Sequence, residues 1–479
     1  ALFSGSSSQD GRSKQRPYMT AAIMHTDFKN KTIAVIGLAR SGLACCEVLT
    51  QLGARVIPYD GKPAAEIAEA VAEIAALGLT PLTGGAALDY SALDYLVTSP
   101  GVRRDAPVLQ NAVAAGVPVL GEIEAAYRIA RAPILAITGT NGKTTTTVLL
   151  GEMLKAAGIE TYIAGNIAAG DIAMPLIKAA HLAPPEAAIV AEISSFQLEW
   201  ISTFRPKVAA LLNISPDHGD RQTWAEYVAA KWRIFENQTR DDFAIVNEEI
   251  SADIPLHKVD ASIWALGGEP DIRQVYVQGL LVIVEGGPGG LWSELFAISE
   301  VKLPGAHNIE NILAAAAMAT AFGVGIEPIR QAATTFTGVV HRLEYVGTIG
   351  GVRYVNNSMC TNAAAFEKSL EALPEPKVVI AGGVFKGGDV AELGKAVVQN
   401  NVRALVLIGR SAPEIEQAAR AAGYANVHRA GTLQDAVTQA ATLALPGDTV
   451  LLAPACASFD MFKDFEDRGE QFKAAVRGL

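Results

Sequence analysis

Basic charge is scarce in this sequence. Of its 479 residues, 39 are Lys or Arg and 50 are Asp or Glu, which gives a formal net charge of −11 at pH 7. Proteins that bind nucleic acids gather Lys and Arg to meet the phosphate backbone. We therefore expect no nucleic-acid partner, and any anionic ligand must be held by a local arrangement of groups.

Cysteines and long apolar runs are also scarce. The four cysteines, Cys45, Cys46, Cys360 and Cys456, form no CxxC pair and are too scattered for a disulfide framework. No apolar run approaches the roughly 18 residues that a membrane-spanning helix needs. These absences favour a protein of the reducing cytosol, without a membrane span.

The length and the repeated alternation of strand and helix patterns predict an α/β protein of three domains. Half of the residues are hydrophobic, and domains usually hold about 100 to 200 residues. Short apolar runs such as 32–37, 133–137 and 377–381 predict buried parallel strands, and alternating strands between Val275 and Val301 predict an antiparallel patch. We expect a tag or disordered leader (1–24), a Rossmann-like N-terminal domain (25–124), a P-loop ATPase-type central domain with a mainly parallel sheet (125–337) and a Rossmann-like C-terminal domain (338–479).

A glycine loop between a predicted strand and a predicted helix is the strongest functional signal. Glycines allow backbone N–H groups to surround phosphate oxygens, Lys143 supplies positive charge to the outer phosphates, and the Thr144 hydroxyl can ligate Mg²⁺. The usual spacing would place a glycine where this chain has Ile137, so the loop is a shortened variant. The predicted ATP-binding residues are Gly139, Thr140, Asn141, Gly142, Lys143, Thr144 and Thr145.

Polar residues at two other strand ends are candidate metal ligands. Glu192 ends the predicted strand 187–191 and would lie beside the phosphate loop, either as a magnesium ligand or as an exposed strand-end acid. The segment Asp217–Asp220 follows another strand and offers further ligands, although a lone histidine such as His218 is usually structural. Lys231 lies in a helical run, where the pattern by itself indicates a solvated face.

Together these segments resemble the Mur ligase family, which builds the peptide of bacterial peptidoglycan. The resemblance extends from about Lys31 to the C-terminus, and it points to the branch that joins glutamate to UDP-N-acetylmuramoyl-L-alanine. The segments that carry it are 138–144, Glu192 with 194–199, Asp217-His218, Ala230-Lys231, Arg233, 304–308 with Asn311, His341-Arg342, 454–462, Phe465 and Arg468-Gly469. The resemblance implies a monomeric ATP-dependent ligase of the bacterial cytoplasm that forms an amide bond through an acyl phosphate and releases ADP and phosphate.

The resemblance also implies roles at matching positions, with ATP and two Mg²⁺ ions as cofactors. The implied catalytic residues are Lys143, His218, Lys231 and Glu192, and the implied metal ligands are Thr144, Glu192, His218 and a carbamylated Lys231. Further ATP contacts would be Asn308, Asn311 and Arg342. The implied nucleotide-sugar contacts are Arg40, Ser41, Asp60, Lys62, Ser99, Gly101, Asn166, Ser194 and His218.

The acceptor amino acid is the point at which the chain departs from the family pattern. The implied amino-acid contacts are Thr361, Lys386, Ser458 and Phe465. Ligases that add D-glutamate typically carry Asp-Ser-Lys-Ala-Thr-Asn where this chain has Asn-Ser-Met-Cys-Thr-Asn, so an acid is lost at Asn357 and a lysine at Met359. We expect a glutamate acceptor, with the D-enantiomer favoured and the L-enantiomer as the alternative.

Three other classes share single features with this sequence. A folylpolyglutamate synthetase has a similar shortened loop but needs no UDP-binding first domain. A P-loop kinase or regulatory NTPase would explain Lys143 but not the segment from Pro454 to Phe465. An NAD-dependent dehydrogenase would depend on the loop 37–42 alone, whose glycine spacing matches the dinucleotide fingerprint poorly.

Overall fold

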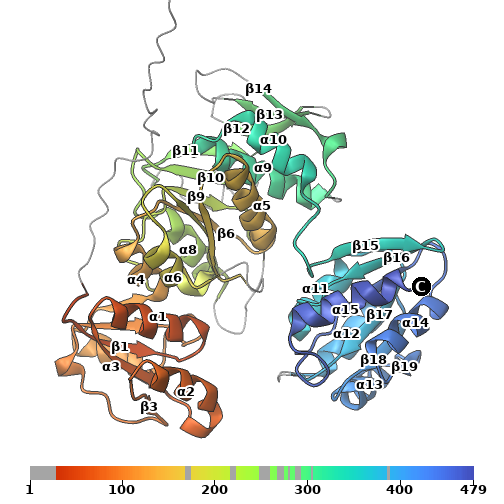
Figure 1. Cartoon of the computed structure of the whole chain (residues 1–479), viewed down its shortest axis with the longest axis horizontal. Helices are drawn as coiled ribbons and strands as arrows, with labels where there is room; N and C mark the ends of the chain where they lie inside the picture. Colours follow the sequence, from red (N-terminus) through yellow and green to blue (C-terminus); the bar gives the residue numbers. More distant parts are fainter. Residues whose placement is uncertain are drawn as a thin grey trace, which may run out of the picture. The chain divides into compact units, whose positions relative to one another are not determined.

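The computed structural model describes residues 28–167, 174–215, 223–247, 259–266, 274–278, 281–285, 293–303, 306–385 and 389–479. The chain divides into two compact units: the first ends at Phe336 and the second begins at Thr337 (Figure 1). The predicted leader 1–24, His218 and Lys386 lie outside the described residues.

The first unit begins with a parallel sheet whose strand order is β3-β2-β1-β4-β5. Helix α1 begins at Arg40, directly after the glycine turn. The strands are β1 (Thr32–Ile36), β2 (Arg55–Asp60), β3 (Leu82–Thr83), β4 (Tyr95–Thr98) and β5 (Val119–Gly121), and the helices are α1 (Arg40–Gln51), α2 (Ala68–Ala76), α3 (Pro107–Ala114) and α4 (Glu122–Ile129).

The same unit contains a larger sheet, in which the described strands run in the order β14-β13-β12-β11-β10-β9-β6-β8-β7. Strands from β7 to β12 pair in parallel, whereas β12, β13 and β14 pair antiparallel, which confirms the predicted antiparallel patch. The strands are β6 (Ile134–Thr138), β7 (Thr161–Gly165), β8 (Ala188–Glu192), β9 (Val208–Leu211), β10 (Phe243–Asn247), β11 (Ser262–Leu266), β12 (Gln274–Gln278), β13 (Leu281–Glu285) and β14 (Ser293–Ala297).

Alternate residues of this sheet supply two separate cores. Leu135 and Ile137 of β6 pack with the helices α5 (Lys143–Ala156), α9 (Ala306–Ala321) and α10 (Ile326–Thr335). Ile134 and Ala136 face the opposite way and join a core with α4, α6 (Leu176–Leu182) and the β1 sheet. Two short helices, α7 (Ser195–Leu198) and α8 (Trp224–Trp232), complete this part of the unit. The shared core explains why the first two predicted domains form one compact unit.

The second unit contains a sheet with the strand order β15-β16-β20-β17-β18-β19, antiparallel between β15 and β16 and otherwise parallel. One face packs against α11, α12 and α13, and the other against α14 and α15. The strands are β15 (Glu344–Ile349), β16 (Val352–Asn356), β17 (Lys377–Gly382), β18 (Val402–Ile408), β19 (Val427–Arg429) and β20 (Thr449–Leu452), and the helices are α11 (Ala363–Glu371), α12 (Ala391–Gln399), α13 (Ala412–Ala421), α14 (Leu433–Leu443) and α15 (Phe465–Arg477). None of the helices in the described part of the chain has the length and hydropathy needed to cross a bilayer.

Candidate active site

The phosphate loop connects the end of β6 to the start of α5. The backbone N–H of Thr140 donates to the carbonyl of Asn213 at 2.9 Å, and that of Asn141 donates to the Asn213 side chain at 2.8 Å. Ile137, which stands in place of the usual glycine, is a fully buried residue of β6. The loop is short because the strand continues through the position at which a longer loop would begin.

Gly142 precedes α5 and is required there for two reasons. Its φ of 81° lies in the left-handed region, and a Cβ at this position would come within 2.0 Å of the Asn311 side-chain oxygen. Asn311 is buried in α9, accepts a 3.4 Å hydrogen bond from Thr146 and donates to Asn308 at 3.2 Å. The two predicted ATP contacts of α9 therefore lie against the start of α5.

The Lys143 ammonium lies over the phosphate loop. Its Nζ donates to the carbonyl oxygens of Gly139 at 3.0 Å and Thr140 at 2.8 Å. A cation at this position neutralises the phosphate charge that a helix N-terminus and a glycine loop attract. Lys143 therefore lies at the predicted loop, and its contact with phosphate stays a prediction.

Glu192 lies beside Thr144. The two side chains are 4% exposed, and the Thr144 hydroxyl donates to Glu192 Oε2 at 2.7 Å. The alternative interpretation of Glu192 as an exposed strand-end acid is wrong, because β8 pairs with β6 and carries the carboxylate into the buried start of α5. A carboxylate and a hydroxyl are oxygen ligands of the kind that Mg²⁺ prefers, so the pair fits such an ion. Within the described ranges, no three His, Cys, Asp or Glu residues gather as a metal cluster.

Lys231 is a second lysine directed at the same loop. It is 2% exposed, its Nζ donates to the Gly139 carbonyl at 2.8 Å, and it lies 4.5 Å from the centre of the Tyr227 ring. The expectation of a solvated helix face is wrong, because α8 turns this residue toward the sheet. The helix that carries Lys231 ends at Trp232, and a 3₁₀ turn follows.

Tyr227 was missed by the sequence interpretation. Its hydroxyl lies 3.0 Å from Thr140 Oγ1, which donates to the Ser215 carbonyl at 3.2 Å and accepts from the Ser215 N–H at 3.0 Å. Tyr227 precedes Lys231 by four residues and so shares its helix face. That spacing is the signal that would have found it.

The carboxyl edge of the β1 sheet brings together several predicted nucleotide-sugar contacts. Asp60 accepts from the N–H groups of Leu38 at 2.9 Å and Lys62 at 3.0 Å, and Ser99 donates to the Gly37 carbonyl at 2.7 Å. A Cβ at Gly42 would lie 1.8 Å from the Gly37 carbonyl oxygen, so only glycine allows this tight turn. Ser41 in α1 and Gly101 after β4 lie on the same edge, where parallel sheets bind ligands.

Among the predicted contacts, Arg40 joins this edge to the chain after β7, whereas Asn166 and Ser194 lie at the ends of β7 and β8 in the larger sheet. Arg40 Nη1 donates to the Ile167 carbonyl at 2.9 Å, and the N–H of Asn166 donates to the Glu192 carbonyl at 2.8 Å. Ser194 caps α7, and its hydroxyl lies 3.0 Å from the side-chain oxygen of Gln197. Residues Asn166 and Ile167, which follow β7, are therefore linked by hydrogen bonds both to Arg40 of α1 and to Glu192 of β8.

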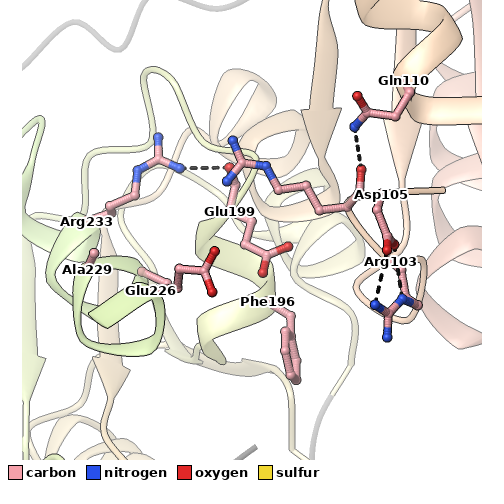
Figure 2. A pocket seen from close by; sticks show the side chains of 10 residues that line it. Arg103, Asp105, Gln110, Phe196, Glu199, Glu226, Ala229 and Arg233 are labelled. Carbon is pink, nitrogen blue, oxygen red and sulfur yellow. Dashed lines mark hydrogen bonds and ion pairs between the residues drawn. The ribbon is translucent and has the colours of Figure 1, made fainter. Parts of the chain in front are cut away.

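A cavity of about 580 Å³ lies between the loop after β4 and the helices α7 and α8. Figure 2 shows Arg233 and Glu226 on one side and Arg103, Asp105 and Gln110 on the other. Arg104 lies 5.7 Å from the centre of the Trp200 ring. Three arginines and three acids line the cavity, so its formal charge is near zero, and the sequence interpretation did not identify it. The lining residues are Arg103, Arg104, Asp105, Gln110, Phe196, Glu199, Glu226, Ala229, Ala230 and Arg233.

Asn357, at which the family motif is altered, is buried in the second unit. Asn357 is 6% exposed, accepts from the Leu343 N–H at 3.2 Å and donates to Ser369 Oγ at 2.5 Å. Ser369 in turn donates to the Ala365 carbonyl at 2.5 Å. An aspartate cannot donate to Ser369, so asparagine suits this buried network better than the acid that the family usually carries.

Arg468 holds the chain around Ser358 and Cys456 in the second unit. This fully buried guanidinium donates to the hydroxyl and carbonyl of Ser358 at 3.0 and 2.8 Å and to the Cys456 carbonyl at 3.0 Å. Burial lowers the pKa of Arg468 to about 10. Ser358 also donates to the Phe465 carbonyl at 2.7 Å. Phe465 therefore lies beside this network, and Ser458 is buried two residues after Cys456, whereas the roles of Thr361 and Arg342 stay predictions.

Comparison with known proteins agrees with these observations. Three family models match the chain: the Mur ligase MurD-like N-terminal domain at residues 31–121, the Mur ligase middle domain at 137–319 and the Mur ligase glutamate ligase domain at 341–456.

Two curated relatives carry the name UDP-N-acetylmuramoylalanine–D-glutamate ligase. The protein from Pelotomaculum thermopropionicum is 43% identical over 462 residues, which cover 95% of this chain and 99% of the relative. That from Caldanaerobacter subterraneus subsp. tengcongensis is 41% identical over 464 residues, with the same coverage. The solved structure of UDP-N-acetylmuramate–alanine ligase MurC from Thermotoga maritima has a TM-score of 0.52 and 17% identity, covers 94% of this chain and 99% of its own, and shows the shared fold. The chain belongs to the Mur ligase family and is an ATP-dependent ligase.

Proposed function

We propose that this ligase joins D-glutamate to UDP-N-acetylmuramoyl-L-alanine in the bacterial cytoplasm, acting as a monomer. The observation that carries the proposal is the convergence of Lys143, Lys231 and the Thr144–Glu192 pair on one phosphate loop. The relatives at 41 to 43% identity are named for this reaction, and the C-terminal match is to a glutamate ligase domain.

The proposed mechanism begins with attack of the L-alanyl carboxylate on the γ-phosphate of ATP. Lys143 offsets the negative charge of the two anions that must meet, and the loop N–H groups hold the phosphates in line. Asn308 and Asn311, which the family resemblance implies as ATP contacts, would bind the adenine. The bond between the γ-phosphorus and the β-phosphate oxygen breaks, so an acyl phosphate forms and ADP leaves. The glutamate amine then attacks the acyl carbon and loses a proton, which gives the amide and releases phosphate.

Magnesium would be held by Thr144 and Glu192, with a second ion at His218 and a carbamylated Lys231. When bound, Mg²⁺ would neutralise phosphate charge. The Lys231 ammonium already points at the Gly139 carbonyl. Carbamylation would replace this donor with an oxygen ligand at the same loop.

Substrate positioning is assigned to the first unit. Asp60, Ser99, Gly101, Arg40, Ser41 and Lys62 would contact the uridine and diphosphate, and Asn166 and Ser194 the sugar. The cavity beside α7 begins two residues after Gly101 and two residues after Ser194. Its near-zero formal charge suits the uncharged sugar, so we assign it to part of the muramoyl group.

The amino acid would be held in the second unit by Thr361, Lys386, Ser458 and Phe465, and Arg342 would contact the nucleotide. The test is phosphate release from ATP measured with D- and L-glutamate in parallel, each with and without UDP-N-acetylmuramoyl-L-alanine. We expect release only when the nucleotide sugar and D-glutamate are both present. Release without the nucleotide sugar would contradict the ligase assignment, and equal or faster turnover of L-glutamate would overturn the assigned enantiomer.

A further inference from the structure

Between β7 and α6 the structure describes residues 166–167 and 174–175, and Asn166 and Ile167 lie between Glu192 and the proposed nucleotide-sugar contact Arg40. The N–H of Gly165 donates to the Met174 carbonyl at 3.0 Å, and the N–H of Met174 donates to the Ile163 carbonyl at 3.2 Å. These bonds bring the two ends of the connection together beside β8. Asn166, a proposed sugar contact, is bonded at one end to the Glu192 carbonyl.

Two charged residues from the β1 sheet and its helices hold this connection at its two ends. Arg40, the first residue of α1, donates to the Ile167 carbonyl at 2.9 Å. Glu122, the first residue of α4, accepts a 2.8 Å hydrogen bond from the Ile177 N–H in the first turn of α6. Each of these two contacts joins the nucleotide-binding part of the unit to the part that carries the phosphate loop.

Glu122 is poorly satisfied for a buried acid. It is 2% exposed, and within the described part of the chain its Oε2 atom is buried without a hydrogen-bond partner. Burial raises the pKa of Glu122 to about 7, against the opposing effects of the Ile177 N–H, the Gln197 side chain, the Leu176 N–H and the charge of Arg40. Cys45 of α1 is the other titratable group that it influences, and burial raises the pKa of that thiol well above its usual value.

Glu124, two residues further along α4, shows what a structural carboxylate looks like in the same helix. It accepts from the N–H groups of Ser202, Thr203 and Phe204 and from Arg128, and these hydrogen bonds hold its pKa below the usual range despite burial. A residue selected only to join the two sheets would be expected to have such a complete set of partners. Glu122 instead has one well-formed bond and an unused oxygen.

We propose that Glu122 is a positioning residue for the nucleotide-sugar substrate: with Arg40 it holds the connection between β7 and α6, and so fixes Asn166 beside Glu192. The proposal rests on the proposed function, because it assigns Arg40 and Asn166 to that substrate. The ionised carboxylate is the stronger acceptor for the Ile177 N–H and faces the Arg40 charge. The neutral form loosens one end of the connection and weakens substrate binding more than it slows the chemical step.

The test is the variant Glu122→Gln, which keeps the shape and removes the charge. At pH 8 we expect KM for UDP-N-acetylmuramoyl-L-alanine to rise roughly fivefold, since a hydrogen bond to a charged acceptor is stronger than one to a neutral acceptor. KM for ATP and kcat should change less than twofold, because Glu122 is proposed to act on binding of the nucleotide sugar and not on the chemical step. At pH 6 the wild-type Glu122 is itself protonated, so the two proteins should have nearly equal KM values.

Thermal unfolding separates positioning from a merely structural role. The raised pKa of Glu122 means that its favourable contribution to stability is complete below the ordinary glutamate pKa and is lost as the pH rises through about 7. At pH 8 the ionised carboxylate therefore disfavours folding, and Glu122→Gln should unfold at the same temperature as the wild type or higher. A substrate-binding defect without loss of stability is the signature of positioning.

Glu47→Gln is the matched control, because Glu47 pairs with Lys178 at 2.5 Å between the same helices α1 and α6 but is partly exposed. It should leave KM unchanged at both pH values. A Glu122→Gln protein with wild-type KM at pH 8, or with the same KM ratio to wild type at pH 6 and pH 8, would overturn the proposal. If Glu122→Gln does not fold, Glu122→Asp must retain the pH dependence of KM. Wild-type protein without any turnover would instead contradict the proposed function.

Discussion

The phosphate loop and the start of the second unit both contain polar motif residues, but the side chains of the two regions make different contacts. Around the loop, Lys143, Lys231 and Thr144 point at one short backbone segment or at a neighbouring acid, where a ligand would meet them. At Asn356 to Ser358, the polar side chains are buried and bonded to the fold itself. The motif residues of the first region therefore converge on one short loop, whereas those of the second are bonded to several different elements of the fold.

The largest expected effect is at the phosphate loop. Lys143→Ala should reduce kcat/KM for ATP about 10³-fold, because in the proposed mechanism it removes the charge that offsets the phosphates at the loop. Phosphate release measures the loss. Lys155→Ala on the same helix is the control, since Lys155 forms only a surface pair with Glu152 at 2.9 Å, and it should be fully active. If Lys143→Ala and Lys155→Ala lose comparable activity, the loss reflects damage to α5 in general, and the proposed role of Lys143 is contradicted.

Lys231→Met should reduce turnover roughly 100-fold while the protein stays folded, because the thioether fills the buried space but cannot ligate or donate. Lys207→Met is a matched control: Lys207 also donates to a backbone carbonyl, that of Asp241, and lies 5.8 Å from the Phe243 ring centre, away from the loop. Turnover measured with and without added bicarbonate tests carbamylation in wild-type protein. Equal losses of turnover in Lys231→Met and Lys207→Met would show that Lys231 contributes to packing and not to catalysis.

In the second unit, Arg468→Met should act on stability first. Removing the guanidinium leaves Ser358 and Cys456 with buried, unsatisfied acceptors, which costs about 3 kcal/mol of unfolding free energy. Denaturant unfolding of the full chain measures it. Arg420→Met is the control, since Arg420 pairs with Glu416 at the surface of α13, and its cost should stay below about 0.5 kcal/mol. If the Arg468→Met protein is as stable as the wild type but has lost turnover, Arg468 contributes to ligand binding and not to the stability of the fold.

Asn357→Asp restores the usual acid of the family and tests whether the altered motif selects the amino acid. We expect about 1 to 2 kcal/mol of destabilisation, because aspartate cannot donate to Ser369, and no change in the ratio of D- to L-glutamate turnover. Asn362→Asp should be neutral, since Asn362 caps α11 by accepting from the Ala365 N–H and aspartate caps equally well. A reversed enantiomer preference in Asn357→Asp would make this position part of the specificity site.

The smallest effect is expected at the cavity beside α7. Arg104→Gln removes a guanidinium that lies over Trp200 and should raise KM for the nucleotide sugar about threefold, the size of a partly exposed cation–π contact. KM for ATP should not change. An effect confined to ATP would exclude the cavity from the nucleotide-sugar site.

The sequence by itself determined the strands and the strand–loop–helix at residues 134–156, because these depend on short-range patterns of apolar residues and glycines, and its motifs carried the resemblance to the family. Only the tertiary structure decided that Glu192 and Lys231 are buried partners of that loop, since a helix or strand end shows its burial only after packing. The same holds for Asn357, whose partners lie on other elements, and for Glu122, whose bond to Ile177 joins residues 55 positions apart. Contacts of that separation are set by how sheets and helices pack, and no local pattern records them.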